Sequence, residues 1–340
     1  MSRGWLLLAI AAQLLVLAWM GAEREWILRT GQVVYLRTAP IDPRDLFRGD
    51  FVRLRYDVNS VRGEQVDPQM SAPGRERKRH EVVYTRLRPA GEGVYDAAGT
   101  SPARPTEGLF LRGRTEDSWR MGWRGGGHFL VKYGIEELFV EQGAGLAIEK
   151  RRGTRDALQV PMEVEVAVSS SGTAVIRGYR WSRLGMKLEV LRRPAPRNRN
   201  VPSPGPEQPL SPKMRITLAN ASDAPLSVAD AGEHCAFHLV TAEWMPQAYP
   251  QASAACAAAP APSAIALAPG ETYSAELDLS EPRWHVLAGG KPVEIGALPG
   301  ITQFRIEYRT PDAAAPAASA GPLWRGRMAS QAFNASGVID

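Results

Sequence analysis

Four acidic side chains gather within sixteen positions near residue 50: Asp42, Asp45, Asp50 and Asp57. Carboxylates this close in sequence can share a proton or bind a hard cation. Asp residues in turn-forming segments more often accept hydrogen bonds from backbone N–H groups. We therefore expect a tight hydrogen-bonded corner here. The alternative is a hydrolase that uses Asp42, Asp45 and Asp50, with or without a metal ion.

Two further acids, Glu136 and Glu137, lie in the stretch 133–140. Neighbouring residues of a strand point to opposite faces, so one of these carboxylates should face inward. A buried carboxylate has to be paired, and Arg53 or Arg55 is the expected partner. Such a pair more often holds a fold together than performs acid catalysis.

A third cluster of reactive side chains, in the second half of the chain, contains His234, Cys235, His238, Met245 and Cys256. His, Cys and Met are the ligand types of copper sites, but this spacing matches no tight metal motif. An isolated cysteine pair in an exported protein is usually a disulfide, which would use the thiolates. We expect a Cys235–Cys256 disulfide and neither a metal nor another cofactor. Copper handling by the second half remains an alternative, with His234, His238 and Met245 as weak ligand candidates.

The N-terminal segment predicts a membrane anchor. Residues 5–20 are apolar except for Gln13, and no charge lies between Arg3 and Glu23. A helix over residues 5–22 comes close to the length that crosses a bilayer. Trp19 and Met20 fit a cleavage site poorly, so an uncleaved signal anchor over 1–26 is preferred to a cleaved signal peptide.

The next part of the chain, residues 30–190, predicts a mostly antiparallel β domain with one short helix. Residues 33–38 are rich in β-branched side chains, and in 51–58 the apolar residues Val52, Leu54, Tyr56 and Val58 alternate with polar ones. That alternation predicts a half-buried strand. Residues 142–152 predict the helix, and 161–168 with 174–181 predict a hairpin.

Residues 191–212 are rich in proline and predict an extended linker. Beyond it, residues 213–340 contain evenly spaced short strand candidates, with loose Ala- and Pro-rich segments between them. This pattern resembles generic immunoglobulin-like and cupredoxin-like sandwiches. The predicted fold class is therefore mostly β: a membrane helix, a β domain and a β-sandwich.

Composition limits the possible partners. The chain is 44% hydrophobic and 23% charged, which is typical of a folded body rather than a disordered one. The formal net charge is +5, and the basic run 75–80 contains no aromatic side chain for stacking on bases. We expect an exposed loop there and no nucleic-acid partner.

The segment 40–56 resembles the signature of the GDYXXLXY family, and five positions carry the likeness: Gly49, Asp50, Phe51, Leu54 and Tyr56. Phe51 stands where the family usually has Tyr. The patch with Tyr133, Gly134 and Glu136 adds to the likeness, which covers roughly residues 1–190. We take these residues as the candidate binding site of the motif.

The resemblance implies a bacterial protein anchored in the inner membrane by one span, with its body in the periplasm. It implies no reaction. We therefore expect a non-enzymatic binding or assembly component. Its partners would be the lipid bilayer, through residues 5–22, and a membrane or envelope protein.

Overall fold

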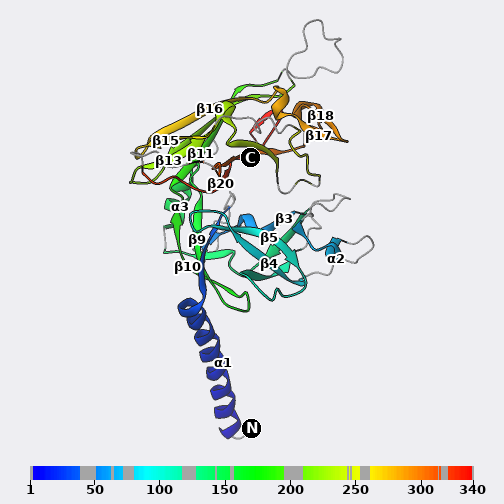
Figure 1. The fold of residues 1–340 in the computed structure, drawn as a ribbon. Coiled ribbons are helices and arrows are strands. Elements are labelled where there is room, and N and C mark those ends of the chain that lie inside the picture. The colour runs from blue at the N-terminus through cyan, green and yellow to red at the C-terminus, as the bar shows by residue number, and fades with distance from the viewer. Residues whose placement is uncertain are drawn as a thin grey trace.

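A long helix, α1 (Arg3–Thr30), leads into a body built of antiparallel sheets in the computed structural model (Figure 1). The structure describes residues 3–38, 51–62, 65–71, 80–116, 128–141, 144–153, 157–194, 210–242, 245, 247–252, 261–312, 314 and 321–338. The mostly β fold class expected from the sequence is confirmed.

Helix α1 is long and apolar enough to cross a membrane. The candidate span is Leu7–Thr30, 24 residues, and none of its most apolar 18-residue window is buried by the body. At a rise of about 1.5 Å per residue, it exceeds the roughly 30 Å hydrocarbon core of a bilayer. The helix contains the predicted span 5–22 and continues eight residues further.

The end of α1 is fixed to the body by its last turn. Ile27 is only 4% exposed, and α1 contacts the strands β9 (Met162–Val168) and β10 (Ala174–Trp181). The N–H of Gly31 donates to the carbonyl oxygen of Ile27 at 2.8 Å. Strand β1 (Gln32–Arg37) starts at the next residue, so Gly31 alone joins the helix to the first sheet.

The first core is enclosed by two main sheets and a short ribbon. One sheet has the order β1-β9-β10, which confirms the predicted hairpin and the predicted strand near residue 33. The other has the order β3 (Ser60–Arg62), β7 (His128–Lys132), β6 (Phe110–Thr115), β4 (Val82–Pro89) and β5 (Tyr95–Ser101). Strand β2 (Phe51–Arg53) pairs with β8 (Glu137–Phe139). Short helices are η1 (Asp57–Asn59), α2 (Pro68–Ser71) and α3 (Ala144–Arg152).

The alternation between residues 51 and 58 predicted the burial correctly but made the strand too long. Val52, Leu54, Tyr56 and Val58 are all buried in the first core. Strand β2 nevertheless ends at Arg53, and the chain turns through η1 four residues later. An alternating pattern indicates which side chains face the core. Here an irregular segment, rather than a strand, buries those alternate side chains.

The second core lies at the far end of the body from α1 (Figure 1). One sheet has the order β11 (Leu184–Arg192), β12 (Lys213–Asn220) and β16 (Thr272–Asp278), and β13 (Leu226–Asp230) pairs with β15 (Ser263–Leu267). A further sheet contains β14 (Phe237–Thr241), β19 (Phe304–Arg309), β20 (Arg327–Ala329), β21 (Phe333–Asn334) and β22 (Gly337–Val338). The remaining elements are β17 (Val286–Ala288), β18 (Lys291–Val293), η4 (Gly232–His234), η6 (Pro282–Trp284) and η7 (Ile295–Ala297).

The chain crosses from the first core to the second earlier than the sequence predicted. Strand β11 pairs with β12, and its apolar residues Leu184, Met186 and Leu188 belong to the second core. The crossing therefore lies at residues 182–183, not near 190. Of the predicted linker 191–212, residues 195–209 lie outside the described residues. Residues 191 and 192 belong to β11, and β12 begins directly after residue 212.

We predict that Gly31→Val loosens the attachment of α1. A Cβ atom at this position would lie 2.6 Å from the carbonyl oxygen of Ile27 and 3.1 Å from the backbone of Val168. We expect a loss of about 1–3 kcal/mol of unfolding free energy, measured by denaturation of the full chain in detergent. Gly21→Val is the matched control, because a Cβ there meets nothing within 4 Å. Equal stability of the two variants would contradict this view of the junction.

Candidate functional site

The described motif residues form a closed hydrogen-bond network inside the first core. The hydroxyl of Tyr56 donates to the carbonyl oxygen of Ile135 at 2.7 Å. The hydroxyl of Tyr133 donates to the carbonyl oxygen of Val58 at 2.9 Å. The two tyrosines thus bind the segments around residues 56 and 133 to each other.

Glu136 is the acceptor at the centre of this network. Its Oε1 accepts from the N–H of Tyr133 at 2.7 Å and from Nδ2 of Asn59 at 3.1 Å, and its Oε2 accepts from the N–H of Gly134 at 2.9 Å. The partners expected from the sequence were Arg53 or Arg55. In the part of the chain that the structure describes, Glu136 is instead satisfied by backbone N–H groups and an amide. A tight turn supplies those donors, and Gly134 adopts a φ of +81° within it.

Asn59 closes the network on the other side. Its Oδ1 accepts from the N–H of Tyr56 at 2.5 Å, and its Nδ2 also donates to the carbonyl oxygen of Val131 at 2.7 Å. Asn59 carried no signal in the sequence, because its role depends on η1 lying against β7. A motif search could not have identified it.

Burial raises the pKa of Tyr56 far above its ordinary value, and the charge of Glu136 adds to the effect. Burial also raises the pKa of Tyr133, where the hydrogen bond with Thr85 acts in the opposite direction and Glu136 in the same one. Both phenols therefore remain neutral donors. Leu54 belongs to the same unit, since its N–H donates to the carbonyl oxygen of Glu136 at 2.7 Å. These contacts give the described motif residues a structural role.

Asp42, Asp45, Gly49 and Asp50 lie outside the described residues, and Phe51 enters only through its backbone pairing with Phe139. The hydrolase alternative stays a prediction.

A second polar cluster joins the two cores. Glu163, on β9, is 2% exposed and accepts from NH2 of Arg37 at 3.2 Å and from Nε of Arg180 at 2.8 Å. Arg37 also donates through NH1 to the carbonyl oxygen of Arg327, which belongs to β20 of the second core. The carboxylate of Glu163 is thus shared by three strands of the first core and is linked to a fourth strand in the second.

The turn between β4 and β5 extends this junction. Glu92, in the turn, accepts from NH2 of Arg183 at 2.6 Å and from the N–H of Arg325 at 3.4 Å. Its neighbour Gly91, with φ +93°, allows the turn to touch the second core, because a Cβ there would lie 2.1 Å from the carbonyl oxygen of Arg325. Further along β5, Asp96 pairs with Nε of Arg327 at 2.5 Å.

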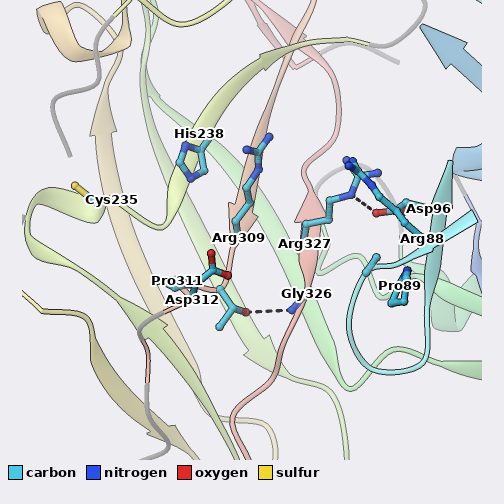
Figure 2. Close-up of a pocket in the computed structure, with 12 residues that line it drawn as sticks. Arg88, Pro89, Asp96, Cys235, His238, Arg309, Pro311, Asp312, Gly326 and Arg327 are labelled. Carbon is cyan, nitrogen blue, oxygen red and sulfur yellow. Dashed lines mark hydrogen bonds and ion pairs between the residues drawn. The ribbon is translucent and has the colours of Figure 1, made fainter. Parts of the chain in front are cut away.

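A cleft of about 470 Å³ opens beside these ion pairs, between the two cores (Figure 2). Arg88 and Asp96 line it from the first core. His238, Arg309, Asp312 and Arg327 line it from the second core. Burial lowers the pKa of His238, and the positive charge of Arg309 lowers it further. Sequence reasoning missed this cleft, because Asp96 and Arg327 are 231 positions apart and only packing brings them together.

The weak metal candidates are separated by their contacts. His238 and Cys235 line the cleft, whereas Nδ1 of His234 lies 2.9 Å from Oδ2 of Asp230. The N–H of Met245 donates to a backbone oxygen, that of Ala242. Within the described ranges, no three His, Cys, Asp or Glu side chains are placed to hold a metal ion. Cys256 lies outside these ranges, so the Cys235–Cys256 disulfide stays a prediction.

Asp230 fixes the turn that carries His234. It accepts hydrogen bonds from the ring of His234 and the hydroxyl of Tyr273 on Oδ2, and from the N–H groups of Ala231 and Ala236 on Oδ1. Burial raises the pKa of Asp230, but these four hydrogen bonds outweigh it and hold the pKa below its usual value. They also hold Glu233 and His234 at the uncommon φ values of +57° and +60°.

Comparison with known proteins finds a family match for residues 13–178. The model of the GDYXXLXY protein family matches residues 13–178, which confirms the resemblance seen in the sequence. No curated protein and no solved structure gave a significant match.

We predict that Glu136→Gln destabilises the protein by about 1–3 kcal/mol, because the new amide places N–H groups opposite backbone donors. Chemical denaturation of the full chain in detergent measures the change. Glu137→Gln is the matched control, since Glu137 is the next residue, the first of β8, and is exposed. If both variants unfold alike, the network does not depend on the charge of Glu136.

We also predict a measurable contribution of Asp230 to acid sensitivity. A folded-state pKa below the unfolded one gives stability that is present at neutral pH and is lost as the pH falls below about 4. Asp230→Asn should be less stable than the wild type near neutral pH, and its melting temperature should change less across the acid range. Asp223→Asn, at an exposed position, should keep the wild-type profile. Parallel pH profiles for the wild type and Asp230→Asn would refute the assignment.

Proposed function

We propose, taking the match to the GDYXXLXY family as the premise, that this protein is a non-enzymatic binding or assembly component of the bacterial inner membrane. It crosses the membrane once through α1 and holds its body in the periplasm. The expected Cys235–Cys256 disulfide suits that compartment, which is oxidising.

The observation that carries this proposal is a polar side chain in the middle of the apolar helix. Gln13 is exposed on α1 and lies inside the candidate span Leu7–Thr30. A side-chain amide in hydrocarbon is stabilised when it hydrogen-bonds to a neighbouring helix. Gln13 itself is exposed, and α1 is the one candidate span among the described residues, so we infer that such a helix comes from another chain.

The rigid junction supports the same proposal. Gly31 is the only residue between α1 and β1, and the last turn of α1 packs on β9 and β10. A body held in this way keeps a fixed height and orientation relative to the membrane. That constraint suits contact with a partner in the same membrane.

The closed network of the motif supports a non-enzymatic role. Tyr56, Tyr133 and Glu136 use their polar atoms on one another's segments. These three residues therefore stabilise the fold, and we infer that other surfaces of the protein bind the partner.

We predict that Gln13→Leu weakens association with a membrane partner by roughly three- to tenfold. The measurement uses a photo-reactive residue at position 14 of the full chain in native membranes. The yield of cross-linked product reports how much of the chain is bound to the partner. Leu15→Ala is the control, because Leu15 is an exposed apolar residue on the opposite face of the same helix.

Cross-linking that is equal in the wild type and Gln13→Leu would refute the proposed contact. The absence of any cross-linked membrane protein would refute a membrane partner for this helix.

A further inference from the structure

The cleft between the two cores has the size of a small-molecule site. Its volume is about 470 Å³, and pockets that bind small ligands usually measure about 300–1,000 Å³. Both cores line it, so a ligand here would touch residues on each side of the junction (Figure 2).

Most charges around the cleft are already matched within the protein. Arg327 pairs with Asp96 through Nε at 2.5 Å and lies 3.5 Å from Glu307 through NH1. Glu307 also accepts from Nε of Arg309. Two guanidinium groups therefore balance two carboxylates, and this set adds no net charge to the cleft.

Two charges and one imidazole remain. Within the described part of the chain, the side chains of Arg88, Asp312 and His238 form no hydrogen bond or ion pair, and all three line the cleft. In Figure 2, Arg88 lies beside Arg327, and Arg309 lies between these two residues and His238 with Asp312. The cleft thus has an unmatched cation at one end and an unmatched anion at the other.

We propose that the cleft binds a small zwitterion that carries a carboxylate and an ammonium group, of the size of an amino acid or a short peptide. The carboxylate would pair with Arg88, whose planar guanidinium suits a bidentate contact. The ammonium would pair with Asp312. The imidazole of His238, kept neutral by burial and by Arg309, would hydrogen-bond to a polar group between them.

Such a ligand fits the charges better than a simple anion does. A phosphate or an unmodified carboxylate would pair with Arg88 but would leave Asp312 facing a second negative charge. A zwitterion can pair with both Arg88 and Asp312. Its two charges are separated, as are these two side chains. This inference is independent of the proposed membrane partner, because it concerns residues of the body alone.

The test uses the full chain in detergent and alanyl-alanine as the probe, with isothermal titration calorimetry as the readout. We expect saturable binding of one dipeptide per chain. N-acetyl-alanyl-alanine lacks the ammonium and alanyl-alanine amide lacks the carboxylate, so each should bind at least about tenfold more weakly. Absence of dipeptide binding, or equal binding of either capped form, would overturn the proposal.

Variants then assign the two ends of the cleft. Arg88→Gln and Asp312→Asn should each weaken binding of the dipeptide by about tenfold or more, while the melting temperature stays unchanged because both side chains are exposed and unpaired. Arg86→Gln and Asp223→Asn are the matched controls, as exposed residues outside the cleft. Unchanged affinity in Arg88→Gln or in Asp312→Asn would show that the dipeptide binds elsewhere.

Discussion

The pairing of buried Glu163 with Arg37 and Arg180 is the constraint on which the arrangement of the body depends. A carboxylate this deeply buried costs several kcal/mol unless its charge is matched and its lone pairs are used. Arg37 meets that need and at the same time donates to the backbone of β20. The charge of Glu163 is therefore matched within the first core, and NH1 of Arg37 finds its acceptor in the second core. This makes the junction between the two cores a defined surface, and the cleft beside it keeps its shape.

Strand β1 connects this junction to α1, the candidate membrane span. It starts one residue after α1 and ends at Arg37, so six residues span the path, about 20 Å in an extended strand. Neither end is free to move, since Ile27 is packed in the body and Arg37 is held by Glu163. The cleft consequently lies at a distance from the end of α1 that the chain itself sets. A partner in the membrane and a ligand in the cleft would act on one connected framework.

The family match covers only part of the residues that line the cleft. The match ends at residue 178, and within it Tyr56, Asn59, Tyr133 and Glu136 hold the first core in shape. Arg88 and Asp96 lie inside the match, but the opposite wall of the cleft comes from residues beyond it. The motif thus maintains a scaffold, and the chemistry of the cleft depends equally on the second half of the chain.

Local patterns in the sequence determined the long apolar helix, the hairpin at 162–181 and the burial of Val52, Leu54, Tyr56 and Val58, because composition and periodicity act over a few residues. The same patterns missed β5, where Ala97, Ala98 and Gly99 are weak strand formers. They also suggested the wrong partners for Glu136, because backbone N–H groups carry no sequence signal. Only the tertiary structure placed β11 in the second core and brought Arg88 and Asp312 to one cleft. Arg88 and Asp312 are more than two hundred positions apart in the sequence. They line one cleft because the two cores pack together at a charged junction, which local sequence patterns do not predict.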